Sequence, residues 1–347
     1  MPPFLLSTEY ALGNLAIILA HKDIMIHPWQ SAQWQQIQSQ LQQQRLAHGL
    51  LFQGCAGLGK KDFAHFLAAA VLCQSPKENA QACGQCASCQ LLSAGTHPDL
   101  TVLAPEETGK AIKVDDVRRL SASMSLTSQL SGYKLAVIES ADQMNVNAAN
   151  SLLKTLEEPA SQSLLILISD HPERLPITIR SRCQQLVFQK PAVQQAQTWL
   201  QQQGLANADL LLKLAHGAPF LALQMNQGEY LEQRQQLLQA LLGIAGRKPV
   251  LDFAAKLAKL PSESLLAGLY DWLADLLKLH QCGESVDLVH QDQAAALKKL
   301  VKLSSVQSLY VMLDQVNQYT QFKSIPLNAQ MLWEDLLLSW QRQIKRV

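Results

Sequence analysis

The chain has 347 residues, of which 48% are hydrophobic and 16% are charged, and its formal net charge is +1. This length is enough for two or three domains, and the near-neutral charge argues against a protein that covers nucleic acid with a broad basic surface. The sequence has no run of the roughly 20 apolar residues that cross a bilayer, so we expect no membrane partner and a cytoplasmic location. Seven cysteines in that compartment are expected to be thiols or metal ligands rather than disulfides.

The first 24 residues connect to no motif, and we interpret them as an extension in which residues 12–19 are a candidate helix. Met25 looks like a more natural beginning of the domain that follows. A Gln-rich helix is expected from Trp29 to Leu46, because apolar residues recur there at spacings of three and four. A short buried strand at residues 48–52 then leads into a glycine-rich loop.

The segment from Gly54 to Lys61 follows the phosphate-loop pattern G-x-x-x-x-G-K but lacks the Ser or Thr that normally ends it. Gly54, Gly57 and Gly59 allow a tight loop whose N–H groups point inward, and the helix that follows adds the positive end of its dipole. Lys60 has the position that reaches a phosphate, whereas Lys61 replaces the hydroxyl that would bind Mg²⁺. The pattern predicts a loop that keeps its shape and has lost part of its chemistry.

A group of four cysteines follows the helix after the loop: Cys73, Cys83, Cys86 and Cys89. Their C-x9-C-x2-C-x2-C spacing suits tetrahedral ligation of Zn²⁺ by thiolates. Four sulfurs leave no open position on the metal, so the predicted role is structural. The alternative is four unrelated thiols, but this density of cysteine in a reducing compartment favours zinc. The three other cysteines are expected to be packing residues: Cys55, Cys183 and Cys282.

Strands and helices alternate up to about residue 190 and predict a parallel sheet that is covered on both faces. Strands are expected at 99–103, from 134, at 163–169 and at 184–188, and helices at 61–72, 114–124 and 145–158. The strand from Lys134 runs into Glu139-Ser140, where an ATPase carries Asp-Glu, so the general base is missing. After Lys190 only helical blocks are expected, and the fold class is therefore α/β followed by all-α.

Five segments, taken together and in order, resemble the delta-prime subunits of bacterial DNA polymerase III clamp loaders, which are AAA+ proteins. These segments are Ala47–Leu51, the cysteine insertion over 73–89, Gly95–Asp99, Ala149–Pro159 and Ser181-Arg182-Cys183. The resemblance covers residues 25–347. It implies an AAA+ parallel-sheet domain with a zinc insertion over 25–190, a small helical lid domain over 191–231, and a helical collar domain for oligomerisation over 232–347.

The resemblance also implies roles for single residues. Arg182 is implied to act as an arginine finger in trans, because a planar and permanently charged guanidinium stabilises charge on the γ-phosphate of ATP held by a neighbour. Without the resemblance, an arginine that satisfies carbonyl groups at a loop end is the alternative. Phe220 stands where active relatives carry a second sensor arginine, and Ser169 lies near the first sensor position. Nucleotide binding is left open, because Lys60 is present.

The hypothesis is a non-hydrolysing clamp-loader subunit, which is no enzyme as an isolated chain but part of the DNA-directed DNA polymerase (nucleotidyltransferase) holoenzyme. The implied partners are the loader's ATPase subunits and delta subunit, with the sliding clamp and primed DNA reached through the assembled complex. One alternative is an active AAA+ ATPase motor that uses Lys60, against which Lys61 and Glu139-Ser140 argue. Another is a zinc-dependent nucleic-acid-binding protein, against which the near-zero net charge argues.

Overall fold

The computed structural model describes residues 26–107, 110–130, 132–227, 229–283, 286–321 and 328–344. The expected extension over 1–24 and its candidate helix lie outside the described residues. The chain forms two compact units, one up to Gln195 and one from Ala196, and each is described by itself. Among the described helices, none combines the length and the apolar character that crossing a membrane would need.

In the described part of the first unit, five parallel strands form one sheet in the order β2-β3-β4-β1-β5. Their bounds are β1 (Gly49–Gln53), β2 (Leu100–Leu103), β3 (Lys134–Ile138), β4 (Ser163–Ser169) and β5 (Gln184–Val187). The central strands β3 and β4 are buried along their whole length, as their continuous apolar runs require when both faces of a sheet are covered. The predicted parallel sheet is confirmed.

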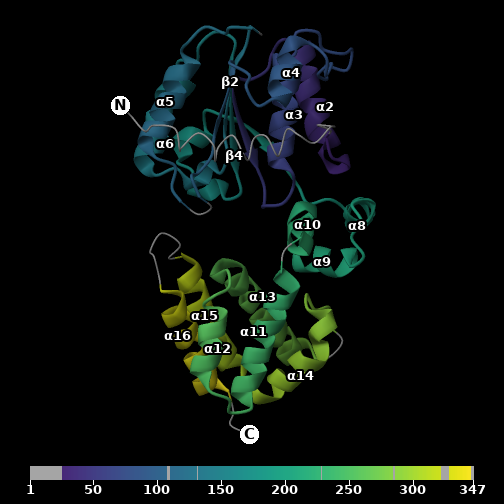
Figure 1. The fold of residues 1–347 in the computed structure, drawn as a ribbon, viewed down its shortest axis with the longest axis vertical. Coiled ribbons are helices and arrows are strands. Elements are labelled where there is room, and N and C mark those ends of the chain that lie inside the picture. Colours follow the sequence, from purple (N-terminus) through teal and green to yellow (C-terminus); the bar gives the residue numbers. More distant parts are fainter. Residues whose placement is uncertain are drawn as a thin grey trace, which may run out of the picture. The chain divides into compact units, whose positions relative to one another are not determined.

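Helices cover both faces of this sheet, with α5 and α6 on one side and α2, α3 and α4 on the other (Figure 1). The described helices of the first unit are α2 (Ser31–Gln42), α3 (Lys60–Leu72), α4 (Ala87–Ser93), α5 (Val114–Met124), α6 (Val146–Glu157) and α7 (Ile177–Arg180), with 3-10 turns η1 (Pro28–Gln30), η2 (Ala141–Gln143) and η3 (Pro172–Arg174). The next helix, α8 (Val193–Gln202), begins at the end of the first unit and lies mostly in the second. The helix predicted to reach Leu46 ends at Gln42, because the chain turns at Gln44, which has a positive φ of 53°.

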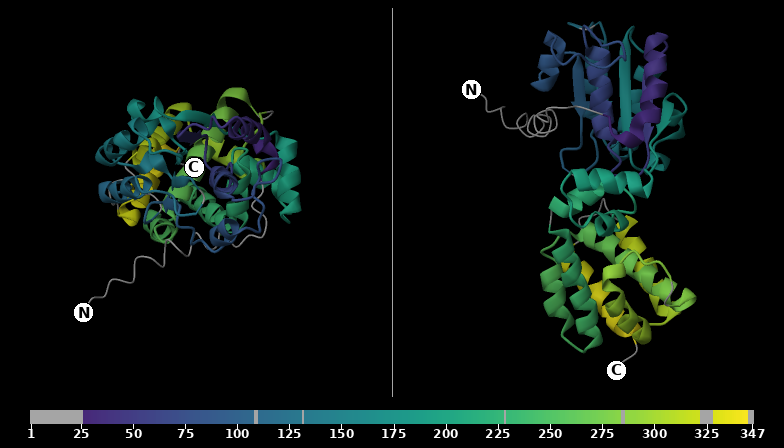
Figure 2. Two further views of the ribbon diagram at one scale, coloured as in Figure 1. Left: turned by 90° about the horizontal axis from the view of Figure 1, so that it is seen from above. Right: turned by 90° about the vertical axis from the view of Figure 1, so that its right-hand side faces the viewer.

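The second unit is helical throughout its described residues, and Figure 2 shows its green to yellow helices packed on one another. Their bounds are α9 (Ala208–Leu214), α10 (Pro219–Gln227), α11 (Tyr230–Ala245), α12 (Val250–Leu257), α13 (Ser262–Cys282), α14 (Ala294–Leu303), α15 (Val306–Gln321) and α16 (Ala329–Gln343), with the 3-10 turn η4 (Gln291–Gln293). The predicted fold class, α/β followed by all-α, is confirmed.

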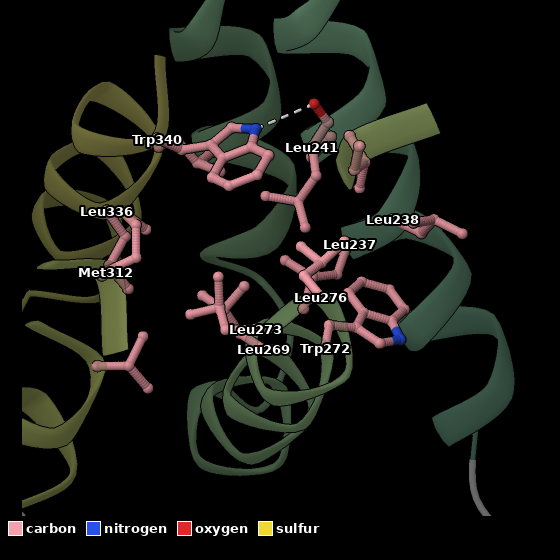
Figure 3. Packing of buried hydrophobic residues seen from close by; sticks show 14 of the residues in the cluster. Leu237, Leu238, Leu241, Leu269, Trp272, Leu273, Leu276, Met312, Leu336 and Trp340 are labelled. Atoms are coloured by element: carbon pink, nitrogen blue, oxygen red, sulfur yellow. Dashed lines mark hydrogen bonds between the residues drawn. The ribbon is translucent and has the colours of Figure 1, made fainter. Parts of the chain in front are cut away.

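Among the described residues of the second unit, apolar side chains form a smaller and a larger cluster. The smaller one lies among α8, α9 and α10 and includes Leu200, Leu211 and Ala222. The larger one is formed by α11 to α16, and Figure 3 shows the part of it around Trp272 and Trp340. The buried Trp340 indole N–H donates a hydrogen bond to the Leu241 carbonyl at 3.2 Å, so its one polar group is satisfied inside this core. The domain boundaries near 190 and 231 stay predictions.

Candidate functional site

The glycine-rich loop joins β1 to α3, and its backbone needs the glycines that the sequence places there. Gly57 and Gly59 have φ angles of 76° and 77°, in the left-handed region that glycine adopts without strain. A Cβ atom at Gly54 would lie 2.3 Å from the carbonyl oxygen of Phe188, so a side chain does not fit at this position. The glycines thus let the chain make a tight turn between β1 and α3, and α3 begins directly after Gly59.

The segment before α2 supports the loop through two side chains to which sequence analysis gave no role. The indole N–H of Trp29 donates to the carbonyl oxygen of Leu58 at 3.0 Å. The side-chain amide of Gln30 donates to the carbonyl oxygens of Leu58 at 3.0 Å and Gly59 at 2.9 Å. Gln30 is fully buried, so these contacts hold the end of the loop from inside the fold.

Lys60 has the position that reaches a phosphate, but its ammonium group is engaged within the chain. Nζ donates to the carbonyl oxygens of Gly54 and Cys55, both at 2.6 Å, and lies 2.6 Å from a carboxylate oxygen of Asp170. An ammonium group has three donors, so three acceptors are enough to satisfy it. The Lys60 side chain is only 3% exposed. A phosphate would have to displace at least one of these partners.

Asp170 was missed by sequence analysis, although a signal for it exists. It directly follows β4, the sheet neighbour of β1, and the loop directly follows β1. The carboxyl ends of parallel strands share one edge of a sheet, and ligand sites of open α/β sheets form at this edge. A polar residue immediately after an apolar strand is therefore a candidate partner for the loop lysine. Ser169, which precedes it, is fully buried, and among the described residues its hydroxyl has no hydrogen-bond partner.

Lys61 replaces the metal-binding hydroxyl and pairs with the acid that follows β3. Its Nζ lies 2.6 Å from one carboxylate oxygen of Glu139, and Nε2 of His65 lies 3.7 Å from the other. The Glu139 side chain is 7% exposed. Burial alone raises the pKa of Glu139, but the neighbouring His65 and Lys61 outweigh it and hold the pKa below its usual value. Glu139 is thus a buried carboxylate whose charge is balanced from within the chain.

The four predicted ligand cysteines come together in the segment that runs from the end of α3 into the first turn of α4. Their sulfur atoms all lie within 4.8 Å of one another, and the pairs Cys73–Cys86 and Cys83–Cys89 are 3.9 Å apart. Four sulfurs placed about 2.3 Å from a central tetrahedral ion are separated by about 3.8 Å. The residues present therefore fit a tetrahedral metal ion bound by four thiolates.

Backbone N–H groups prepare part of this cluster for the thiolate form. Those of Gln85 and Cys86 lie 3.4 and 3.3 Å from the Cys83 sulfur, and they lower the Cys83 pKa. Burial raises the pKa of Cys86, but hydrogen bonds, first those of the backbone N–H groups of Cys89 and Gln74, outweigh it and lower the pKa to about 6. Burial raises the pKa of Cys73 and Cys89. A bound cation would displace protons from all four sulfurs.

The other cysteines agree only partly with the expectation that they are packing residues. Cys183 is buried, and burial raises its pKa to about 12. Cys55 and Cys282 are exposed, so the expectation is wrong for them. Cys55 lies on the turn of the glycine loop, and Cys282 ends α13 just before Gly283, whose positive φ of 75° ends the helix. Residues at such turns stay at the surface regardless of side-chain polarity.

The segment Gly95–Asp99, which contributed to the resemblance, has a structural role through Asp99. Asp99 is fully buried and accepts hydrogen bonds from the backbone N–H groups of Gln129 at 2.8 Å and Leu130 at 2.9 Å. Nζ of the buried Lys134 lies 3.3 Å from it. The carboxylate thus fastens the loop before β3 to the start of β2, and this accounts for an acid at this position without any catalytic role.

Arg182 lies just before β5, at the amino ends of the parallel strands. The glycine loop lies at their carboxyl ends, because it follows β1. The loop follows the last residue of β1, whereas the Arg182 carbonyl oxygen is 3.5 Å from where a Cβ of Gly49, the first residue of β1, would stand. Five residues of β-strand span about 16 Å. The strands are parallel, so the glycine loop and Arg182 do not come together within this chain.

The guanidinium group of Arg182 contacts two partners within the described part of the chain. Nη2 lies 2.6 Å from a carboxylate oxygen of Glu157, at the end of α6, and Nη1 donates to the Thr178 carbonyl at 3.0 Å. The Arg182 side chain is 37% exposed, so the rest of it faces solvent. The last predicted position, Phe220, lies on α10 of the second unit, with its ring centroid 5.1 Å from that of Trp199.

Family models of DNA polymerase III match most of the chain. A family model described as "DNA polymerase III, delta subunit" matches residues 29–192, and one described as "DNA polymerase III, delta subunit, C terminal" matches residues 228–342. A gamma subunit-related protein of DNA polymerase III from Thermotoga maritima is a structural neighbour with a TM-score of 0.41 and 16% identity, covering 90% of this chain and 99% of that one.

Curated relatives are named DNA polymerase III subunit delta'. The chain is 37% identical to the one of Pseudomonas aeruginosa over 91% of its own length and 97% of the relative, and 35% identical to the one of Escherichia coli over 90% and 94%. The one of Bacillus subtilis is 32% identical over 87% of this chain and 93% of the relative. Identity at this level over nearly the full length of both chains means that this chain belongs to the delta' subunit family of DNA polymerase III.

Proposed function

We propose that this chain is a non-hydrolysing delta' subunit of a DNA polymerase III clamp loader and supplies Arg182 in trans to ATP bound by a neighbouring ATPase subunit. The observation that carries this proposal is that the glycine loop lies at the carboxyl ends of the strands and Arg182 at their amino ends. An arginine about 16 Å from its own loop cannot touch a phosphate there. An exposed guanidinium at that end of the strands is open to a nucleotide held by another chain, which supports a role in trans.

The state of the glycine loop supports the non-hydrolysing part of the proposal. Lys60 is held by Gly54, Cys55 and Asp170, so phosphate binding competes with contacts that already exist. Mg²⁺ would find no hydroxyl ligand at Lys61, and it would approach an ammonium group of the same sign of charge. Without the metal and an acid to orient water, the charge that develops on the γ-phosphate is not stabilised. The proposal therefore gives this chain neither ATP turnover nor a tightly bound nucleotide.

The chemistry proposed for Arg182 follows from the guanidinium group. Its five N–H donors are permanently charged and fixed in one plane, and two of them contact Glu157 and Thr178. Among the described residues these are its contacts, which leaves three donors for an acceptor from outside the chain. Charge that builds on a γ-phosphate during hydrolysis attracts such fixed donors more strongly than the ground state does, and this difference accelerates the reaction.

The proposal also includes partners and a structural metal. Residues 232–347 are proposed to act as the collar through which the chain joins the ATPase subunits and the delta subunit, while the sliding clamp and primed DNA are reached through the whole complex, in the cytoplasm. The large apolar cluster of α11 to α16 supports a collar with its own core. Zn²⁺ is proposed as the metal of the four cysteines, because four thiolates in tetrahedral spacing match its preferred coordination.

The test is a reconstituted loader that contains either the wild-type chain or the Arg182→Ala variant. In-trans arginine fingers contribute about 10³–10⁵ in rate to their own site, and a loader with several ATP sites is expected to lose less overall. ATP hydrolysis stimulated by DNA and clamp should fall, and Arg182→Lys should rescue it poorly. Arg174→Ala, an exposed arginine on η3, is the matched control. Equal rates for wild type and Arg182→Ala would leave the chain as a scaffold only.

A further inference from the structure

We infer that Glu157 is a positioning residue for Arg182, and that it holds the guanidinium in the direction in which a neighbouring subunit's nucleoside triphosphate would meet it. This inference rests on the proposed arginine-finger function. Glu157 belongs to the segment Ala149–Pro159. It is the last residue of α6, and its carboxylate lies 2.6 Å from Nη2 of Arg182.

The backbone on the Glu157 side of this contact is anchored in the core. Leu156, the preceding residue, is buried, and its carbonyl oxygen accepts a hydrogen bond from Nε2 of His48 at 3.0 Å. A Cβ at Gly49 would lie 3.0 Å from a methyl carbon of Leu156, so the glycine allows the end of α6 to approach β1 closely. The end of a helix normally leaves carbonyl groups without partners. Here the carbonyl of Leu156 is bound by His48, and this contact fixes the position of Glu157 relative to the sheet.

The backbone on the Arg182 side is anchored in the same core. Cys183, the next residue, is buried in the apolar cluster that also contains Leu156, and the sulfur of Cys183 lies 3.5 Å from the position of a Gly49 Cβ. The Arg182 N–H donates to the Ile179 carbonyl at 3.1 Å. Both ends of the Glu157–Arg182 contact therefore start from rigid supports, which is the condition for a side chain to be held in one direction.

Two contacts from different elements are enough to orient the guanidinium. Nη2 is held by Glu157 from α6, and Nη1 is held by the Thr178 carbonyl from α7. Because the group is planar and rigid, fixing two of its nitrogens fixes the directions of the three remaining N–H donors. An arginine that is ordered before assembly loses less conformational freedom when it meets a phosphate. Removing Glu157 leaves one contact, about which the side chain is free to swing.

A purely structural role for this ion pair predicts a different result. The side chains of Arg182 and Glu157 are 37% and 49% exposed, and ion pairs at such positions contribute little to stability. A structural role would thus leave ATP hydrolysis by the loader unchanged. A positioning role lowers the rate constant of hydrolysis and leaves assembly and the apparent affinity for ATP unchanged, because the nucleotide is bound by the other subunit.

The experiment uses the reconstituted loader with Glu157→Ala, Glu157→Gln, Arg182→Ala and the double variant Glu157→Ala/Arg182→Ala. Glu157→Ala should lower kcat for ATP by up to about fivefold, the factor that corresponds to the upper end for exposed ion pairs. KM and copurification with the other subunits should stay unchanged. Glu157→Gln should fall between, because its amide oxygen still accepts a hydrogen bond. Glu158→Gln, the exposed neighbouring acid, is the matched control and should behave as wild type.

The double variant decides whether Glu157 acts through Arg182. If it does, the double variant should be no slower than Arg182→Ala alone. Three results would overturn the inference on its own: a Glu157→Ala loader that is as fast as wild type or faster, a double variant slower than Arg182→Ala by the same factor, or an effect on KM alone. An Arg182→Ala loader that matches wild type would instead overturn the proposed arginine finger, and this inference with it.

Discussion

The ammonium group of Lys61 lies 2.6 Å from the carboxylate of Glu139, so the residue that replaces the metal-binding hydroxyl is the partner of the acid after β3. In the sequence these are two separate departures from an ATPase. In the structure the two departures are coupled. Lys61 on α3 places a positive charge beside the Glu139 carboxylate, where an ATPase would place a metal ion. Restoring one of the two residues alone would leave the other without its partner.

We expect Lys61→Ala to lower the free energy of unfolding by about 1–3 kcal/mol at pH 7, because the buried Glu139 carboxylate would lose its closest partner. Urea denaturation measures this loss. Adding Glu139→Gln should recover part of it, since the amide removes the buried charge. Equal stability of wild type and Lys61→Ala would contradict the coupling.

The same pair predicts a dependence of stability on pH. The pKa of Glu139 is lower in the folded chain than its ordinary value of 4.5, because His65 and Lys61 outweigh the opposing effect of burial. Its contribution to stability is therefore complete above pH 4.5 and is lost as the pH falls through the folded-state pKa. The Glu139→Gln variant should lack this part of the acid-induced loss. Parallel curves for the two proteins would exclude a stabilising role of the ionised carboxylate.

The isolated chain should release no phosphate from ATP above the level of a Lys60→Ala control. The reason is that the metal hydroxyl and the acidic pair are both absent, and each supports a separate part of phosphoryl transfer. Lys61→Thr alone should not restore turnover, because Glu139-Ser140 still lacks the second acid and Asp170 still holds Lys60. Steady phosphate release by the wild-type chain, followed with a coupled assay, would show that the site is active.

The cysteine cluster should hold one Zn²⁺ per chain in elemental analysis of protein prepared without chelators. Cys86→Ser should lose the metal and lower the melting temperature, because metal binding contributes directly to the folding of such clusters. Cys282→Ser is the matched control: this cysteine is exposed and lies outside the cluster. Metal-free wild-type protein, or full metal content in Cys86→Ser, would refute the assignment.

A buried histidine in the helical unit predicts loss of stability at acidic pH. Asp275 and His290 have fully buried side chains, with Nδ1 of His290 3.1 Å from the carboxylate. Burial lowers the pKa of His290, so the unfolded chain takes up a proton below pH 6.5 that the folded chain refuses. Stability should therefore fall as the pH drops below 6.5, and His290→Asn should flatten this part of the curve. Tryptophan fluorescence, to which Trp272 contributes with its ring centroid 5.3 Å from that of His290, measures the transition.

Features that depend on short stretches of chain could be predicted from the sequence. The glycine loop, the cysteine spacing and the alternation of strands and helices each repeat a local pattern, and the structure places them as expected. The predicted helix end at Leu46 was wrong, because the left-handed residue Gln44 turns the chain earlier. The packing role of Cys55 and Cys282 was wrong, because both lie at turns on the surface. Apolar periodicity carries no signal for such turns.

By itself, the sequence determined that the chain has an α/β part followed by helices, a loop without its metal-binding hydroxyl, and four thiols spaced for one ion. Only the tertiary structure decided which charges meet. Lys60 meets Asp170 because the neighbouring parallel strands β1 and β4 have their carboxyl ends side by side. Arg182 meets Glu157 at the amino ends of the strands, because α6 and α7 both lead into strands there. Such pairs depend on the order of the strands in the sheet. This order is set by contacts between residues that are distant in the chain, so it exists only once the sheet has formed.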